Sequence, residues 1–172
     1  MIEAYRGVSP RIHPTAWVHA SAVIIGDVEL GPEVSIWPGC VLRGDQGSIR
    51  IGAESNIQDG TIIHATRGLS HTVVGARVTV GHRVVLHGCH VEDDCLIGMG
   101  AVVLDNAHIE RHVIVGAAAL VPLNRRVPAR SLVLGMPAKV VRSLGDEEID
   151  EHITHAHREY TRLASEYRGA NE

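Results

Sequence analysis

The chain of 172 residues contains no phenylalanine, and its few tryptophans and tyrosines bring the aromatic content to only 3%. Hydrophobic residues nevertheless make up 45% of the sequence, so the core must consist almost entirely of Val, Ile, Leu and Ala. Large irregular cores normally use aromatic rings to fill space, and the scarcity of rings therefore predicts a narrow, regular interior. The length is that of one domain.

Strong charge, long apolar runs and paired cysteines are also missing. The net charge is -4 and basic residues are scattered, which argues against a nucleic-acid partner. Without a membrane-length apolar run or a secretory leader at the N-terminus, we expect no membrane partner. Cys40, Cys89 and Cys95 cannot all pair with one another and predict buried, reduced thiols in a cytoplasmic protein.

The sequence has instead an aliphatic residue at every sixth position. A period of six fits neither an α-helix nor a simple alternating strand, but it is typical of the short strand and turn of a hexapeptide β-helix. We therefore predict a mainly β fold, a parallel β-helix of about six coils between residues 12 and 126. The inward-pointing anchors of these coils are Ile12, Val18, Ile24, Leu30, Ile36, Leu42, Ile51, Ile57, Ile63, Val74, Val80, Leu86, Val91, Ile97, Val103, Ile109, Val115 and Val121.

The six-residue spacing changes at three places in the middle coils. The step from Leu42 to Ile51 is nine residues, the step from Ile63 to Val74 is eleven, and that after Leu86 is five. Extra or missing residues in a solenoid map to loops on its outside, often on the binding face. The middle coils are therefore the expected location of a site.

The repeat is predicted to end at Pro128. Residues 132–141 then indicate a terminal strand with a Gly-Met-Pro turn, and an apolar stripe predicts a helix from Asp146 to about Tyr167. We expect this helix to pack along the outside of the β-helix. Residues 1–142 would form the β-helix and residues 143–172 the helical segment of the same structural domain.

The repeat distinguishes three of the twelve histidines from the rest. His64 and His87 each follow an anchor directly. If the eleven-residue step is two hexapeptides with one residue deleted, both anchors occupy the same column of successive coils. The two backbones then lie about 4.8 Å apart, so that both imidazoles can bind one metal ion.

His82 follows an anchor of the neighbouring column and therefore projects from a different corner. In a threefold assembly, His82 of one subunit could complete a site begun by His64 and His87 of its neighbour. Three neutral imidazoles with an open position form a catalytic site of the zinc type.

Several short segments in the middle coils combine into a specific pattern: Arg43-Gly44-Asp45, Asn56-Ile57-Gln58-Asp59-Gly60, His64, Gly81-His82 and His87-Gly88. With this pattern the chain resembles the γ-class carbonic anhydrases over nearly its whole length. The resemblance implies a left-handed β-helix, a homotrimer, and a zinc site between subunits that could also hold iron(II) or cobalt(II). It assigns the metal ligands to His64, His82 and His87.

The resemblance also implies a reaction, the reversible hydration of carbon dioxide to bicarbonate by a metal-bound hydroxide. Gln58 would orient the hydroxide or bind bicarbonate, and Asn56 lies in the same strand segment. Arg43 would form an ion pair with Asp59 across the subunit interface, as a structural contact or one that also touches bicarbonate. Asp45 is expected beside the metal ligands or at the interface.

Two departures from the founding pattern concern the exit of the proton. Gln46 replaces a glutamate, and residues 65–71 replace an acidic loop that carries a proton-shuttling glutamate, so that His71 is the remaining candidate shuttle. Relatives that lack the acidic loop have a tyrosine beside the metal, which Tyr160 matches. Packing of the terminal helix is the alternative role of Tyr160.

Three other functions stay open. A metal-bound hydroxide could hydrolyse an acyl-CoA thioester, and the chain could instead be a non-catalytic subunit of a trimeric assembly. A hexapeptide acyltransferase would share the fold but would not need three ligands around an open metal position. The favoured interpretation is a carbonic anhydrase-like lyase.

Overall fold

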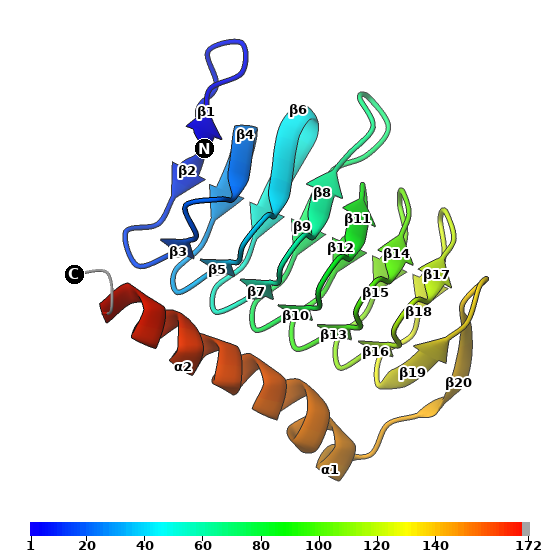
Figure 1. Ribbon diagram of the computed structural model, residues 1–172. Helices are drawn as coiled ribbons and strands as arrows, with labels where there is room; N and C mark the ends of the chain where they lie inside the picture. The colour runs from blue at the N-terminus through cyan, green and yellow to red at the C-terminus, as the bar shows by residue number, and fades with distance from the viewer. Residues whose placement is uncertain (170–172) are drawn as a thin grey trace.

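The computed structural model describes residues 1–169 as a parallel β-solenoid with one long helical segment lying along it (Figure 1). The strands are β1 (Ile2–Glu3), β2 (Arg11–Ile12), β3 (Trp17–Val18), β4 (Val23–Leu30), β5 (Ser35–Ile36), β6 (Val41–Ile51), β7 (Asn56–Ile57), β8 (Ile62–His64), β9 (Thr72–Val74), β10 (Thr79–Val80), β11 (Val85–His87), β12 (His90–Val91), β13 (Leu96–Ile97), β14 (Val102–Val103), β15 (His108–Ile109), β16 (Ile114–Val115), β17 (Leu120–Val121), β18 (Arg126–Val127), β19 (Ser131–Leu134) and β20 (Lys139–Ser143).

The strands stack in three columns, which give the solenoid three faces. We call the column β3-β5-β7-β10-β13-β16-β19 the helix face. The open face contains the first halves of β4 and β6 followed by β8, β11, β14 and β17. The charged face contains β2, the second halves of β4 and β6, and β9, β12, β15 and β18. The long strands β4 and β6 therefore continue around one edge of the solenoid.

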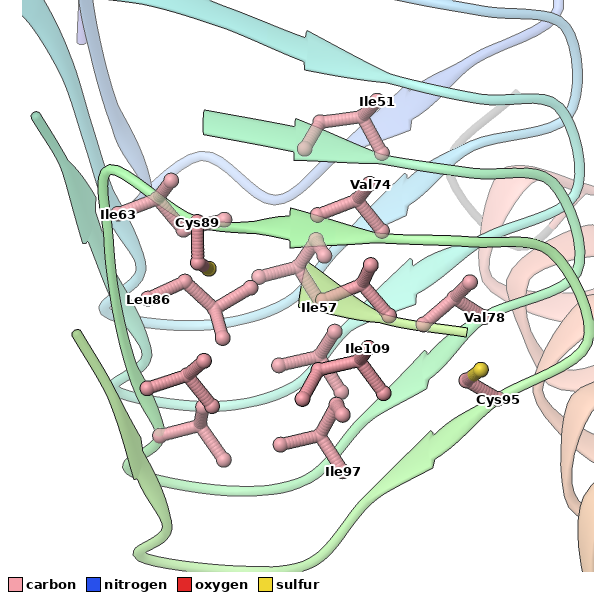
Figure 2. Close-up of a cluster of buried hydrophobic side chains, with 14 of the residues drawn as sticks. Ile51, Ile57, Ile63, Val74, Val78, Leu86, Cys89, Cys95, Ile97 and Ile109 are labelled. Atoms are coloured by element: carbon pink, nitrogen blue, oxygen red, sulfur yellow. The ribbon is translucent and has the colours of Figure 1, made fainter. Parts of the chain in front are cut away.

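The core is a thin aliphatic column, as the absence of phenylalanine predicts. Ile57, Ile63 and Leu86 are fully buried, and Figure 2 shows such side chains pointing toward one another in the interior that the strands enclose. The three cysteines are free and buried, and burial raises the pKa of Cys40 to about 11 and that of Cys89 to about 12. These thiols are therefore protonated and unreactive at neutral pH.

The register confirms the interpretation of the eleven-residue step. Ile63 pairs with Leu86, and His64 pairs with His87. The expected end of the repeat at Pro128 is wrong, because the six-residue spacing continues through Val127 and Val133, each only 1% exposed. Pro128 lies in a turn between β18 and β19, where a missing N–H breaks no ladder bond. Seven strands consequently stack on the helix face, giving about seven coils rather than six.

The predicted terminal helix is present as a continuous helical segment formed by α1 (Asp146–Glu148), the π-helical η1 (Ile149–Thr154) and α2 (His155–Gly169). The predicted helical segment extended to residue 172, and its positions 170–172 lie outside the described residues. The last coil ends in a hairpin, in which β19 and β20 pair antiparallel. In residues 1–169, no helix has the length and apolarity needed to span a bilayer.

The two tryptophans, Tyr160 and Tyr167 lie outside the core, between the solenoid and α2. Trp17 and Trp37 form a buried cluster with Ala164, and Tyr160 packs against it. This cluster anchors α2 to the helix face, where the helix contacts β5 and β7.

Candidate metal centre

Two imidazoles face each other at one edge of the open face. His64 and His87 are the last residues of β8 and β11, and the parallel register places them on adjacent coils. Nδ1 of His64 lies 3.2 Å from Nε2 of His87. In Figure 1, the extended β6 and the loop that follows β8 project from this part of the solenoid, on the side away from α2.

A carboxylate accepts a hydrogen bond from the outer nitrogen of each ring. Asp45 Oδ1 lies 2.9 Å from His64 Nε2, and Asp105 Oδ2 lies 2.9 Å from His87 Nδ1. Burial by itself would raise the pKa of both carboxyl groups. Hydrogen bonds outweigh the effect of burial and hold both pKa values below the ordinary range. Asp45 accepts them from His64 and Arg43. Asp105 accepts them from Ser70 and His87. Both carboxylates are therefore ionised at neutral pH.

The ionised carboxylates decide where the ring protons sit. Each imidazole donates its N–H outward to an aspartate, so the unprotonated nitrogens point toward each other. Two lone pairs at this separation repel unless a cation lies between them. Nitrogens bound to one tetrahedral zinc at about 2.0–2.1 Å would lie roughly 3.3–3.4 Å apart. The two residues thus fit a zinc-type ion in donor chemistry and in spacing.

His82 lies at the opposite edge of the open face, between β10 and β11. Its Nδ1 is 2.9 Å from Asp59 Oδ2, and its Nε2 is 3.5 Å from the hydroxyl of Tyr160. His82 borders a surface hollow of about 630 Å³, which is also lined by Asp59, Arg83, Met99 and Gly100. The third predicted ligand therefore has its own carboxylate partner and faces open space.

Within one chain, only two of the three predicted ligands come together. No group of three or more His, Cys, Asp or Glu side chains suited to a metal ion occurs within residues 1–169. A third ligand to the ion between His64 and His87 would therefore have to come from elsewhere. The three predicted ligands therefore lie at two separate edges of the open face, His64 and His87 at one and His82 at the other.

The remaining predicted residues divide between the same two edges. Arg43 Nη1 is 2.5 Å from Asp45 Oδ2 and belongs with His64, and Gln46 is half-buried in β6 nearby. Gln58 precedes Asp59 and is 4% exposed; its Nε2 donates to Asn56 Oδ1 at 3.1 Å. Asn56 in turn donates to Thr79 Oγ1 at 3.0 Å.

The candidate proton shuttle His71 is held by a different segment. Its Nδ1 accepts a hydrogen bond from the backbone N–H of Ser48 at 3.0 Å. In the neutral ring this hydrogen bond occupies the one nitrogen that has a lone pair. The geometry therefore does not favour His71 as a shuttle.

Sequence reasoning missed Asp105 and Ser70. Val103 lies in the same column as Ile63 and Leu86, one coil further along. Asp105 is two residues after Val103, so extending the register by one coil would have placed it near His87. Ser70 had no comparable signal, because it lies in the irregular loop after β8 and reaches Asp105 across 35 positions.

Between the two edges, the open face is apolar on its outer surface. Its outward residues form a continuous ladder across six paired strands, and Ile62 in the middle is 46% exposed. The outward residues of the charged face are mostly ionisable, whereas α2 packs on the helix face. The apolar ladder consists of Val23, Val41, Ile62, Val85, Val102 and Leu120.

Comparison with known proteins places these features among hexapeptide-repeat proteins. The chain matches the family described as bacterial transferase hexapeptide (six repeats) over residues 9–44 and 88–122. It is 47% identical over 154 residues to the protein YrdA of Escherichia coli, covering 86% of this chain and 84% of that protein. It is 44% identical over 168 residues to mitochondrial gamma carbonic anhydrase 2 of Arabidopsis thaliana, covering 95% of this chain.

The chain spans 60% of the length of that plant protein. Among solved structures, a Bacillus cereus protein described as an acetyltransferase superposes with a TM-score of 0.95 at 36% identity, over 98% of this chain and 97% of the other. The solenoid and its terminal helical segment therefore recur together in that structure.

Proposed function

Because the chain belongs to the hexapeptide-repeat family that contains the γ carbonic anhydrases, we propose that it is a homotrimeric, zinc-type metalloenzyme that hydrates carbon dioxide reversibly to bicarbonate. Iron(II) or cobalt(II) could replace zinc at the same ligands. The observation that carries the proposal is the pair of imidazoles, His64 and His87, whose ring nitrogens face each other at 3.2 Å while a carboxylate contacts the outer nitrogen of each ring. A cytoplasmic location belongs to the proposal and is supported by the buried free thiols.

The open face supports the intersubunit metal site. It has a half-site on each edge, His82 on one and the His64–His87 pair on the other, separated by the apolar ladder. When one edge of a subunit contacts the opposite edge of the next subunit, the interface is heterologous. Such interfaces form a closed ring when the rotation between neighbouring subunits brings the last subunit back to the first. A ring of three subunits would cover the apolar ladder and place His82 of each chain beside His64 and His87 of the next.

The protein residues have separate tasks in the proposed reaction. His64 and His87 of one chain and His82 of another would hold the zinc, which when bound would lower the pKa of a water molecule to about 7. Asp45 and Asp105 keep the lone pairs of His64 and His87 directed inward. Gln58 uses its N–H for Asn56, so its Oε1 stays available to accept a hydrogen bond from water or bicarbonate. Gln46 cannot carry a proton and His71 Nδ1 is occupied by the Ser48 N–H, so the proton would have to pass to a buffer molecule.

The test is to purify the protein with Zn(II), and anaerobically with Fe(II), and to measure metal content, carbon dioxide hydration and acyl-CoA hydrolysis. We expect metal-dependent hydration that is lost in His82→Ala. The matched control is His108→Ala, which removes a histidine that pairs with Glu92 on the charged face. It should keep both metal and activity.

The other possible results of these assays distinguish the alternative functions. Metal-dependent acyl-CoA hydrolysis without hydration would favour the thioesterase. Trimers that bind metal without either activity would favour an assembly subunit. Full metal occupancy in His82→Ala would contradict the intersubunit site.

A further inference from the structure

We propose that Asp105 is the positioning residue for His87 in the metal centre, and that Ser70 and Gly88 allow it to be held against that histidine. This inference rests on the metal site proposed above. It concerns an aspartate outside the sequence motifs and explains why the histidine is followed by glycine.

The Asp105 carboxylate is fixed through both oxygens. The side chain is 7% exposed; Oδ2 accepts from His87 Nδ1 at 2.9 Å, and Oδ1 accepts from the hydroxyl of Ser70. Ser70 is buried, and its Oγ accepts a hydrogen bond from the backbone N–H of Thr66 at 3.0 Å. The loop after β8 therefore ends in a hydroxyl group that is itself held in place and directed at the carboxylate.

Gly88 provides the space for this contact. A Cβ at residue 88 would lie 2.1 Å from Ser70 Oγ and 2.2 Å from Asp105 Oδ1, which no real contact permits. Gly88 also has a φ of +62°, but backbone conformation alone does not explain the site. His112, Asn106 and other non-glycine residues adopt similar values in this solenoid. The glycine is required because the Ser70–Asp105 hydrogen bond passes over it.

The consequence for His87 concerns its tautomer. Because Asp105 Oδ2 lies 2.9 Å from His87 Nδ1 and cannot approach a second lone pair so closely, the ring proton lies on Nδ1 and Nε2 keeps its lone pair toward His64. Without an acceptor at residue 105, the proton can move to Nε2, which then points an N–H at the place of the metal. Asp45 is held differently, since it also pairs with Arg43 at the partly exposed end of the site.

The decisive measurement is zinc affinity by competition with a chromophoric chelator, together with the visible spectrum of the Co(II)-loaded protein. Asp105→Ala should weaken zinc binding about 10- to 100-fold and alter the Co(II) bands. Asp105→Asn keeps an acceptor oxygen but loses the charge. Its zinc affinity should therefore be lower than that of the wild type and higher than that of Asp105→Ala. Thermal unfolding of the zinc-free proteins shows whether each variant is folded.

The matched control is Glu92→Gln, which alters a carboxylate that pairs with His108 at 2.7 Å outside the site. Its zinc affinity should equal that of the wild type. Gly88→Ala should weaken zinc binding in the same direction as Asp105→Ala. Gly7→Ala should not, because residue 7 also has positive φ but no atom within 4 Å of an added Cβ.

Two negative results have different meanings. If wild-type protein binds zinc and folded Asp105→Ala binds it equally tightly with an unchanged Co(II) spectrum, the role of Asp105 is overturned while the proposed function stands. If wild-type protein binds no zinc, the proposed function and the inference both fail.

Discussion

The hydroxyl of Tyr160 lies 3.5 Å from Nε2 of His82, although the two residues are 78 positions apart. The same ring packs edge-on against Trp37, with the ring centroids 5.2 Å apart. Burial raises the pKa of Tyr160, so its hydroxyl stays protonated at neutral pH. Tyr160 thus anchors the helix and also places a hydrogen-bond donor beside the third predicted ligand.

Replacing Tyr160 separates these two roles. Tyr160→Phe keeps the ring against Trp37, so we expect stability to change by no more than about 1 kcal/mol, while carbon dioxide hydration falls several-fold. Tyr160→Ala should also lower the melting temperature, because the aromatic cluster loses a ring. Stopped-flow hydration and thermal unfolding measure the two effects. Wild-type hydration in Tyr160→Phe would restrict Tyr160 to packing.

Mixing two inactive variants tests the division of the site between chains. His82→Ala and His64→Ala each remove one half-site, so neither homotrimer should bind zinc tightly or hydrate carbon dioxide. Co-refolded mixtures should regain zinc and activity, since a mixed ring contains one junction with both half-sites intact. Mixing His64→Ala with His87→Ala is the control and should restore nothing, because both changes damage the same half-site.

The apolar ladder should control assembly. Ile62→Glu places a charge in the middle of the open face, where burial between subunits would leave it without a partner. We expect the trimer to dissociate and zinc content to fall, as measured by light scattering and metal analysis. Val73→Glu is the matched control, because Val73 points outward on the charged face between Arg50 and His90. A trimeric Ile62→Glu protein would contradict the assignment of this face.

His157 should make the stability of the zinc-free protein depend on pH. It lies on the buried side of α2 and is 8% exposed, and its Nδ1 has no hydrogen-bond partner in the described part of the chain. Burial lowers its pKa, partly offset by Glu54 and Asp94, while Arg77 lowers it further. The unfolded chain therefore takes up a proton first as pH falls.

The sign of this effect follows from linkage. A lowered histidine pKa contributes stability that is present above the unfolded value of 6.5 and is lost as pH falls below it. The slope is at most about 1.4 kcal/mol per pH unit for one proton. His157→Gln should flatten the melting temperature between neutral and mildly acidic pH. The exposed His152→Gln should leave the slope unchanged, and an equal change in both variants would contradict the assignment.

Much of the fold could be predicted because one short-range rule governs it. The six-residue spacing identified the buried column and, through the eleven-residue step, the pairing of His64 with His87. It failed at Pro128, where a residue that breaks ordinary strands falls in a turn and leaves the repeat intact. The seventh coil could have been found by giving Val127 and Val133 the same weight as the earlier anchors.

The candidate site was less predictable wherever it depends on irregular segments. Ser70 contacts Asp105 from a loop whose path the repeat does not determine. His71 lies in the same loop, and its Nδ1 accepts a hydrogen bond from Ser48. The engagement of its Nδ1 could not be foreseen, because it depends on the conformations of two loops together. Motifs therefore identified the candidate ligands, and only the structure showed the groups that contact and orient them.

The helical segment also changes how the solenoid can come apart. Each coil touches only its neighbours, so a bare solenoid would fray coil by coil from its ends. Here Arg142 of β20 and Glu148 of α1 are joined at 2.6 Å beside the last coil, while Arg168 of α2 reaches Glu33 at 3.1 Å near the first. Tyr167 packs on Trp17 at that same early end. The helical segment thus connects the two ends of the solenoid. Disruption of either end weakens contacts at the other end, which favours cooperative unfolding.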